Sequence, residues 1–428
     1  MLTYQELIQQ MNQSMLAAEP DRVGLLCDVL DQLDHPEKQY QIMHIVGTNG
    51  KGSTGTLIGN LLINTGEKVG HFASPAIHND REQIQLQNKM ISETDFVSTY
   101  EKIIGKLTAD FKMNQLSIFE WFVIIMLQYF ADQGVSWAII EAGLGGKYDA
   151  TNAISAPIIT IVTHVDLDHT MILGNTIKKI AYNKSDVIKP NTTVFLAPRQ
   201  SQDTKNVVEQ RIVERHAQSL IDTEYVDIKI DSETTNGFDL EISSHELRQT
   251  KVHLGMLGEF QLDNLKTVIS LYDWLIQDGY VSNNNLIGDI LKLTLSQTKI
   301  AGRMQIIQQQ PTVILDAAHN PDSTKRLIES LKRIYPNQKL KFVLGFLQDK
   351  NYLEMAHLYE AVADEIVVVT PDNLQRAIPA VELHEVITNS KVVDNAQIGL
   401  SQLLTRSNLD DVIIVTGSFY TIKEVEIE

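Results

Sequence analysis

The sequence predicts an α/β fold: a mostly parallel sheet with helices on both faces, followed by a second, smaller α/β unit. Short apolar runs of strand length alternate with longer segments of helical periodicity. Most of these expected strands stop at glycine-rich or polar turns, the edge at which parallel sheets bind ligands. The chain has 428 residues, too many for one hydrophobic core, so two or three domains are expected.

A strand, a glycine-rich turn and a helix follow one another near the N-terminus. An apolar run over 42–46 is expected to be a buried strand, and a helix is expected from Ser53 to about Thr65, stopped by Gly66. The turn between them, residues 47–52, reads Gly-Thr-Asn-Gly-Lys-Gly. Glycines let backbone N–H groups surround an anion, and the positive end of the helix dipole faces the same point. The stretch therefore predicts a phosphate-binding loop.

The side chains of this loop favour phosphate binding over a plain strand-to-helix turn, which is the alternative. Lys51 supplies a cation for β- and γ-phosphates, and the hydroxyl of Ser53 or Thr54 can reach a bound Mg²⁺. The spacing departs from the usual G-x-x-x-x-G-K-[ST] pattern. Ile45 stands in the place of the first glycine, and Gly52 separates the lysine from Ser53.

The other elements of the first 200 residues continue the alternation. Helical spacing extends from the N-terminus to about Asp34 and places Met15 on the apolar face. A strongly apolar helix over 118–130 starts at a capping box of Ser117 and Glu120, so helix geometry alone explains Glu120. A strand is expected over 68–72, and buried strands are expected over 137–140 and 157–163.

Carboxylates and a histidine follow two of these strands, at the edge where ligands bind. Glu141 lies about ninety residues after Lys51, where P-loop nucleotidases keep the acidic residue that holds Mg²⁺; an ordinary loop carboxylate is the alternative. Asp166, Asp168 and His169 form a second candidate cluster for Mg²⁺ or substrate, with simple loop caps as the alternative.

The second half of the chain begins with a polar, weakly alternating region and ends in another strand–helix series. Its expected elements are strands over 226–230 and 238–242, a helix over 262–276, and strands over 312–315, 341–344, 365–369 and 412–415. We expect the domain boundary near Thr298, which gives domains 1–298 and 299–428. Asp316 and His319, in a turn after a strand, can grip a ribose or a phosphate; an aspartate-capped turn is the alternative.

Composition narrows the class of protein. Hydrophobic residues make up 43% and charged residues 21%, as in a folded, water-soluble protein. The net charge of −18 argues against nucleic acid and anionic membranes as partners, so an anionic substrate needs local positive charge. The single cysteine, Cys27, and the lack of a signal-peptide pattern indicate the cytoplasm. The longest apolar run, 121–127, is too short to cross a bilayer.

Several motifs together are more specific than each one alone. They are Gly47-Thr48-Asn49-Gly50-Lys51-Gly52-Ser53, Ala73-Ser74-Pro75, the run from Glu141 to Asn152, Asp168-His169, Asp316-Ala317-Ala318-His319-Asn320-Pro321 and Thr416-Gly417-Ser418. The set closely resembles the folylpolyglutamate synthase and dihydrofolate synthase family within the Mur ligase superfamily. The resemblance implies a P-loop, Mur ligase-like ATP-binding domain (1–298) and a Rossmann-like glutamate-ligase domain (299–428).

The resemblance also implies roles for individual residues. The ATP triphosphate would bind to Gly47, Thr48, Asn49, Gly50, Lys51, Gly52 and Ser53. Mg²⁺ would be held by Ser74, Glu141 and His169, and the nucleotide would also meet Asn264, Arg303, Asp316 and His319. The pterin-bearing substrate would contact Ser117, Ile118, Phe119, Glu120, Tyr148, Asp149 and Ala150, while Ser418 and His319 would lie near the incoming glutamate. Lys51, His169 and Lys184 would be catalytic. Lys184, a surface lysine by its sequence context alone, falls where the family has a carbamylated lysine.

The implied reaction is ATP-dependent amide formation through an acyl phosphate. It would add L-glutamate to a folate, with or without activity on dihydropteroate, using ATP and Mg²⁺ in a cytoplasmic monomer. A Mur-type ligase acting on a cell-wall precursor is the main alternative. Those enzymes usually carry a further N-terminal domain, and only about forty residues precede the phosphate loop here. A non-catalytic nucleotide-binding module is the third hypothesis, disfavoured by the joint presence of Lys51, Glu141 and His169.

Overall fold

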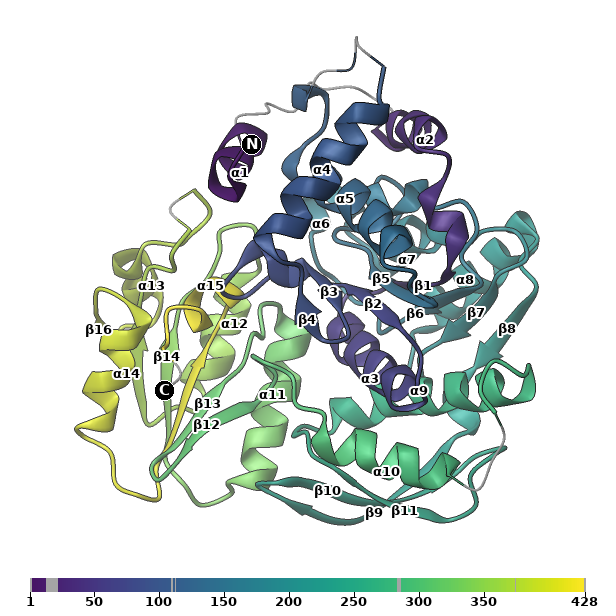
Figure 1. The fold of residues 1–428 in the computed structure, drawn as a ribbon. Helices are drawn as coiled ribbons and strands as arrows, with labels where there is room; N and C mark the ends of the chain where they lie inside the picture. Colours follow the sequence, from purple (N-terminus) through teal and green to yellow (C-terminus); the bar gives the residue numbers. More distant parts are fainter. Residues whose placement is uncertain are drawn as a thin grey trace.

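The predicted α/β architecture is confirmed, with one large sheet, one smaller sheet and a three-stranded sheet between them in sequence. The structure is a computed structural model that describes residues 2–12, 22–108, 111, 113–282, 286–373 and 375–426. Figure 1 shows the two main sheets in separate lobes, the first in blue and teal and the second in green and yellow. None of the helices in these ranges combines the length and the apolar character needed to cross a bilayer.

The first lobe is built on an eight-stranded sheet of order β4-β3-β2-β5-β1-β6-β7-β8. In this order, the neighbouring strands β2, β5, β1, β6, β7 and β8 pair in parallel. Strands β3 and β4 form an antiparallel edge beside β2. The bounds are β1 Gln41–Val46, β2 Val69–Phe72, β3 Ile84–Leu86, β4 Lys89–Met90, β5 Trp137–Glu141, β6 Ile159–Val162, β7 Thr193–Leu196 and β8 Ser219–Asp222. The carboxyl ends of six parallel strands therefore meet at one edge.

Helices cover both faces of this sheet, because its strands carry apolar side chains on both sides. One hydrophobic cluster joins the sheet to α3 and α9, and another joins it to α1, α2, α4 and α5. The bounds are α1 Tyr4–Asn12, α2 Arg22–Gln32, α3 Lys51–Asn64, α4 Glu93–Lys106, α5 Ile118–Asp132, α6 Thr170–Leu173, α7 Ile177–Lys184, α8 Gln202–Arg215, α9 Phe260–Gln277 and α10 Ile287–Gln297. Figure 1 shows α3 and α9 below the sheet and α4 and α5 above it.

Two smaller sheets complete the fold. The antiparallel sheet contains β9 Asp227–Thr234, β10 Gly237–Ser243 and β11 Thr250–Leu254, and it shares the cluster under α3 and α9. The second lobe has the strand order β12-β13-β17-β14-β15-β16, in which only β12 is antiparallel. Its elements are β12 Gln305–Gln309, β13 Thr312–Leu315, α11 Pro321–Ile334, β14 Leu340–Leu344, α12 Tyr352–Glu360, β15 Glu365–Val368, α13 Ala380–Val386, β16 Lys391–Val392, α14 Ala396–Leu404, β17 Val412–Thr416 and α15 Phe419–Ile422.

The expected elements are present, with differences at their ends. The glycine-rich helix begins at Lys51 rather than Ser53, because Gly50 takes the N-cap position with φ +91°. The N-terminal helical pattern corresponds to α1 and α2; Met15 lies outside the described residues. The predicted boundary near Thr298 falls between the end of α10 and the start of β12, and the division into two domains stays a prediction.

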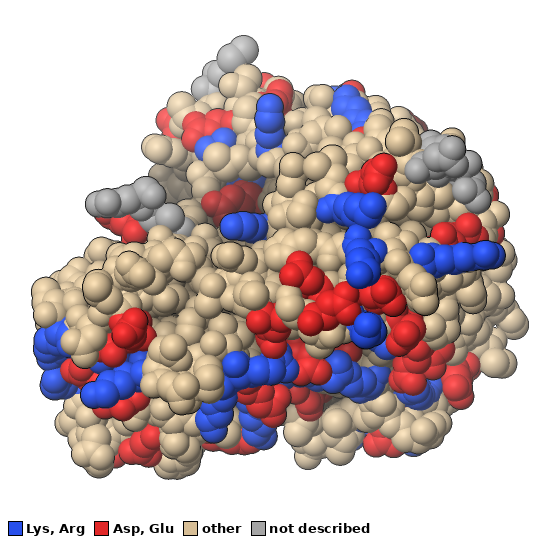
Figure 2. All heavy atoms as spheres, turned by 90° about the horizontal axis from the view of Figure 1, so that it is seen from below, with Lys and Arg blue, Asp and Glu red and all other residues tan. Residues whose placement is uncertain are grey.

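On the face shown in Figure 2, acidic and basic side chains lie beside one another in a band.

Candidate functional site

A cavity of about 1570 Å³ lies between the two lobes, at the carboxyl ends of the parallel strands. Single-ligand pockets are usually about 300–1,000 Å³, so this cavity has room for more than one substrate. The predicted site residues that line it are Gly47, Thr48, Asn49, Gly50, Lys51, Gly52, Ser53, Ser74, Ser117, Phe119, Glu120, Glu141, Tyr148, Asp149, Ala150, His169, Lys184, Asn264, Arg303, Asp316, His319 and Ser418. Ile118 does not line the cavity, because it packs against the hydrophobic cluster beneath α5.

The phosphate loop requires glycine at two positions. Gly47 has φ +154°, and a Cβ there would lie 1.9 Å from the Thr163 hydroxyl oxygen. Gly50 has φ +91°, and a Cβ there would lie 2.4 Å from the Asn264 side-chain oxygen. The first N–H groups of a helix have no acceptor within that helix. The loop thus brings the open end of α3 to the cavity, where an anion can accept those hydrogen bonds.

Two lysines converge on one carbonyl of this loop. Lys51 Nζ donates to the Gly47 carbonyl oxygen at 3.1 Å, and Lys184 Nζ donates to the same oxygen at 2.8 Å. Lys184 is buried at the end of α7, so the surface position expected from its sequence context is wrong. Burial, with help from the Lys51 charge, lowers the pKa of Lys184 to about 7. Burial also lowers the pKa of Lys51, while the carboxylates of Glu141 and Asp168 oppose that shift.

The three predicted metal ligands carry oxygen and nitrogen atoms that can coordinate a cation. Glu141, at the end of β5, accepts a hydrogen bond on Oε1 from His71 Nε2 at 2.9 Å, and its Oε2 has no recorded partner among the described residues. Ser74, after β2, lines the cavity. His169 has φ +47° at the start of α6 and accepts a hydrogen bond on Nε2 from Lys350 Nζ at 3.0 Å. The donor set therefore fits a divalent ion, provided that Lys350 gives up His169.

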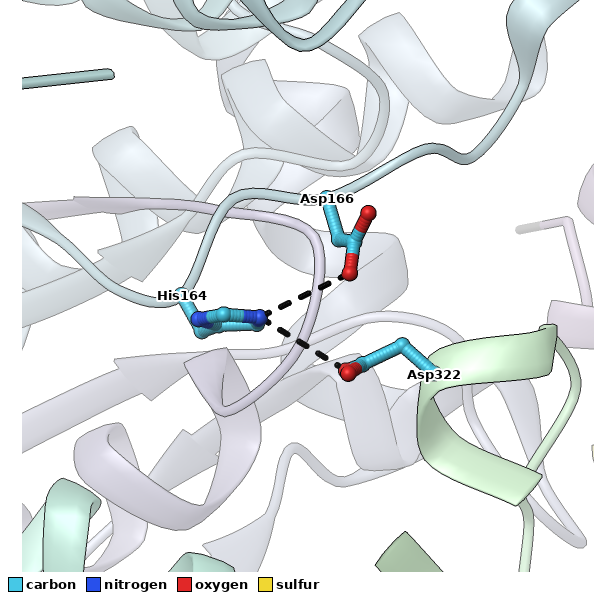
Figure 3. A group of neighbouring side chains, drawn as sticks. All are labelled: His164, Asp166 and Asp322. Carbon is cyan, nitrogen blue, oxygen red and sulfur yellow. Dashed lines mark ion pairs between the residues drawn. The ribbon is translucent and has the colours of Figure 1, made fainter. Parts of the chain in front are cut away.

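Another group, His164, Asp166 and Asp322, has metal-ligand composition (Figure 3), and an arginine already contacts it. His164 Nε2 lies 3.8 Å from Asp166 Oδ2 and 3.7 Å from Asp322 Oδ2. Arg326, from α11, donates to Asp322 at 3.1 Å and places a second guanidinium nitrogen 3.2 Å from His164 Nε2. A cation of the second lobe thus occupies this group. Asp166, which the sequence places with Asp168 and His169, turns toward this ion-pair network instead.

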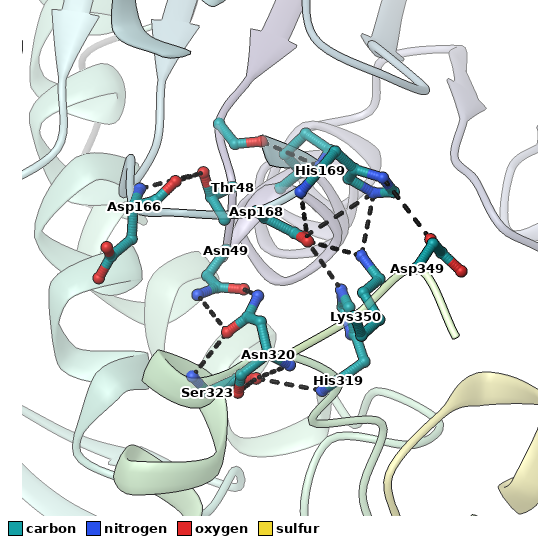
Figure 4. A network of polar contacts seen from close by, with 12 residues as sticks. Thr48, Asn49, Asp166, Asp168, His169, His319, Asn320, Ser323, Asp349 and Lys350 are labelled. Atoms are coloured by element: carbon teal, nitrogen blue, oxygen red, sulfur yellow. Dashed lines mark hydrogen bonds and ion pairs between the residues drawn. The ribbon is translucent and has the colours of Figure 1, made fainter. Parts of the chain in front are cut away.

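Asp168 joins the two lobes (Figure 4). Its Oδ1 accepts a hydrogen bond from Lys350 Nζ at 2.7 Å, and His319 Nε2 lies 3.7 Å from its Oδ2. Burial would raise the pKa of Asp168, but the nearby His319 imidazole and the Lys350 charge outweigh burial and hold it well below its usual range. Burial lowers the pKa of His169 to about 4, against the attraction of Asp168. The cavity is therefore crossed by a charged contact between lobes.

The phosphate loop itself also touches the second lobe. Asn49 Nδ2 donates to Asp322 Oδ2 at 2.8 Å, and Asn320 Nδ2 donates to Asn49 Oδ1 at 3.1 Å. Figure 4 shows these amides facing one another between the loop and the start of α11. Asn320 is also the N-cap of α11, so the same side chain caps this helix and contacts the phosphate loop.

Arg303 and Asp316 carry charge into the cavity from the segment that enters the second lobe. Burial lowers the pKa of Arg303 and raises that of Asp316, and each charge opposes the shift of the other. Asp316 accepts backbone hydrogen bonds from Met304 and Ala318, both at 2.8 Å, which hold the connection between the lobes. Arg303 lies over the Phe419 ring, 5.1 Å from its centroid. Asn264, on α9, donates to Gln261 at 2.9 Å.

The residues predicted for the pterin side are held by local structure. The capping box of Ser117 and Glu120 is confirmed, and Arg22 of α2 adds a hydrogen bond to Glu120 Oε1 at 2.9 Å. Asp149 accepts hydrogen bonds from Leu144 N at 2.7 Å and from the Thr151 backbone at 2.9 Å, so it fixes the glycine-rich loop after β5. Tyr148 is exposed, whereas the Ser418 hydroxyl caps α15.

Sequence reasoning missed three residues that this geometry brings in. Lys350 follows β14 in a polar loop, the signal used for the other strand ends, so it could have been found. His71 lies inside an apolar strand and Arg326 on a helix face; their partners are distant in sequence, and no local pattern marks them.

The comparisons with known proteins agree with this geometry. The family described as "Mur ligase, glutamate ligase domain" matches residues 302–419. The dihydrofolate synthase/folylpolyglutamate synthase of Bacillus subtilis is 28% identical over 411 residues, which cover 94% of each chain. The folylpolyglutamate synthase of Lacticaseibacillus casei is 28% identical over 406 residues, covering 92% of this chain and 90% of the relative.

The solved structures share the whole fold. The bifunctional folylpolyglutamate synthase/dihydrofolate synthase of Yersinia pestis, complexed with AMPPNP and a Mn ion, is similar with a TM-score of 0.84 at 24% identity. The match covers 99% of this chain and 97% of that chain. The chain is thus similar along nearly its full length to dihydrofolate synthase/folylpolyglutamate synthases, and its residues 302–419 match the glutamate ligase domain of the Mur ligases.

Proposed function

We propose that the chain is an ATP-dependent ligase that joins L-glutamate to a folate, and that it also accepts dihydropteroate. One observation carries the proposal: the phosphate loop of the first lobe and the charged residues of the second lobe line one cavity. The Bacillus subtilis relative is named for both activities, and its likeness covers nearly the whole chain. The Lacticaseibacillus casei relative is named for folylpolyglutamate synthesis alone, so the two acceptors need separate tests.

In the reaction we propose, a carboxylate oxygen of the substrate attacks the γ-phosphorus of ATP. The bond from that phosphorus to the bridging oxygen breaks, giving an acyl phosphate and ADP. The amine of L-glutamate then attacks the acyl carbon, loses a proton and expels phosphate, which leaves an amide. A free carboxylate is a poor electrophile, so phosphorylation is needed to create a leaving group.

The chain's own residues contribute positioning and charge neutralisation to this reaction. Lys51 and Arg303 bring positive charge to the phosphate end of the cavity. Ser74, Glu141 and His169 would hold a divalent ion, Mg²⁺ in our proposal, which neutralises phosphate charge when bound. Lys184, with a pKa of about 7, has a large neutral fraction near neutral pH, which supports carbamylation by CO₂.

Residues of both lobes enclose the reacting groups. Asn49, Asp168 and Lys350 already join the lobes across the cavity. An enclosed site keeps water from an acyl phosphate, which would otherwise hydrolyse. One chain supplies both sides of the cavity, which supports a monomer as the active form. The single cysteine supports a cytoplasmic enzyme.

Phosphate release from ATP tests the proposal. The purified chain is mixed with ATP, Mg²⁺, L-glutamate and one acceptor: tetrahydrofolate, dihydropteroate or a UDP-muramyl substrate. We expect release with the first two and a product heavier by one glutamyl residue in mass spectrometry. Release with the muramyl substrate alone would favour a cell-wall ligase, and no release with any acceptor would leave a nucleotide-binding module. The Lys51→Ala variant supplies the background rate.

A further inference from the structure

A buried imidazole–carboxylate pair stands at the metal side of the cavity, on two adjacent parallel strands. His71 lies near the end of β2 and Glu141 at the end of β5. His71 Nε2 donates to Glu141 Oε1 at 2.9 Å, and both side chains are buried. Strand alternation turns His71 toward α3, whereas the neighbouring Gly70 faces Phe130 on the opposite side of the sheet.

Helix α3 packs closely against this pair. A Cβ at Gly55 would lie 2.8 Å from His71 Nε2 and 3.1 Å from Glu141 Oε1. One turn earlier, a Cβ at Gly52 would lie 3.9 Å from both oxygens of Glu141. The glycines let the helix backbone approach the pair closely on this side, because a side chain at Gly55 would collide with both members. The geometry of the carboxylate is therefore set by contacts with two elements.

The hydrogen bond from His71 makes the two carboxylate oxygens of Glu141 different. A buried carboxylate is costly unless its oxygens find partners. His71 satisfies Oε1, while no hydrogen bond or ion pair to Oε2 is recorded in the described part of the chain. Glu141 lines the cavity, and its charge acts on Lys51 and Arg303 there. Oε2 is thus the oxygen that remains for a cation.

We propose that His71 is a positioning residue that orients Glu141, so that Oε2 is presented to a divalent cation. The inference rests on the proposed function in one respect, because it takes Glu141 as a ligand of that ion. Metal-ligating carboxylates are themselves oriented by hydrogen bonds, and loss of such a partner typically lowers metal affinity about 10- to 100-fold. A histidine that served only the packing of β2 would leave metal affinity unchanged when replaced by an apolar residue.

The test is Mn²⁺ binding to the full chain without nucleotide. Binding is measured from the decrease in the electron paramagnetic resonance signal of free Mn²⁺. We expect His71→Leu to weaken binding about 10- to 100-fold. The amide of glutamine can donate from a position close to Nε2, so His71→Gln should restore most of the affinity. Gly55→Ala should also weaken binding, because its methyl group displaces the pair without removing either member. It keeps the test decisive if His71→Leu does not fold.

A matched control removes another imidazole–carboxylate pair. His253 Nδ1 lies 2.9 Å from Asp239 Oδ1 on the antiparallel sheet, and neither residue lines the cavity. His253→Leu should leave Mn²⁺ affinity unchanged. Wild-type affinity in both His71→Leu and Gly55→Ala would overturn the inference, as would a His71→Gln variant as weak as His71→Leu.

Failure of the proposed function can be distinguished from failure of the inference about His71. In one outcome the wild-type chain binds Mn²⁺ through Glu141, as shown by loss of binding in Glu141→Ala, but none of the acceptors gives phosphate release. That outcome would refute the ligase and leave the role of His71 intact. Turnover by the wild type, together with normal Mn²⁺ binding by His71→Leu and Gly55→Ala, would refute the role of His71 alone.

Discussion

Replacing Lys350 by methionine removes the cation that joins the lobes at Asp168. The two side chains are 5% and 8% exposed, and their charged atoms are 2.7 Å apart. Removing one partner of a buried ion pair costs about 3–5 kcal/mol, because the other charge stays buried without compensation. His319 remains 3.7 Å from Asp168, so we expect the lower end of that range, about 3 kcal/mol.

The location of the pair decides how this cost appears. Asp168 belongs to the first lobe and Lys350 to the second, so opening of the lobes lets water reach Asp168. We therefore expect Lys350→Met to increase the radius of gyration in small-angle X-ray scattering, with a smaller change in the free energy of unfolding. Lys341→Met is the matched control. Lys341 and Asp411 are 2.8 Å apart and equally buried, but both belong to the second lobe.

The control should lose unfolding stability and keep the wild-type scattering curve. The double variant Lys350→Met, Asp168→Asn should recover much of the compactness, because it leaves no unpaired buried charge. Scattering and unfolding curves of Lys350→Met that match those of the wild type would refute the view that this contact holds the lobes together.

Four further outcomes are expected. Lys51→Ala and Glu141→Ala should each abolish phosphate release while circular dichroism shows an intact fold; near-normal rates in either would remove that residue from the site. Lys184→Ala should be inactive and partly rescued by short carboxylic acids such as formate, whereas unchanged activity would mean that Lys184 has no part in turnover. Gly50→Ala should weaken nucleotide binding, measured by calorimetry, because its φ of +91° is strained for alanine; an unchanged affinity would contradict this. Burial lowers the pKa of His44 to about 3, so its contribution to stability is full above the unfolded value of about 6.5 and is lost as the pH falls toward 3. Between pH 6.5 and 4 that is about 3 kcal/mol of unfolding free energy, which denaturant titrations of His44→Gln should no longer show.

The features predictable from the sequence are those encoded by neighbouring residues. The phosphate loop was predictable because strand, glycines, lysine and helix are contiguous. Glu141 was predictable because a strand end places its side chain at the ligand-binding edge. The start of α3 was misplaced by two residues because the positive φ of Gly50 makes that glycine an N-cap, a property of the folded turn.

The features that the sequence did not reveal depend on partners far along the chain. Lys184 is buried only because α7 packs beneath the phosphate loop, which brings its ammonium group to the Gly47 carbonyl. Ile118 was included because its neighbours in the motif line the cavity, but its own side chain turns into the core. His71 meets Glu141 through the register of β2 and β5, and no local pattern contains that register.

Three basic side chains that line the cavity are paired with carboxylates. Lys350 is paired with Asp168, Arg376 with Asp349, and Lys423 with Asp372. With an overall charge of −18, the molecule exerts no long-range pull on a polyanion diffusing toward it. Encounter with a polyanion must therefore proceed against a weak repulsion that dissolved salt diminishes.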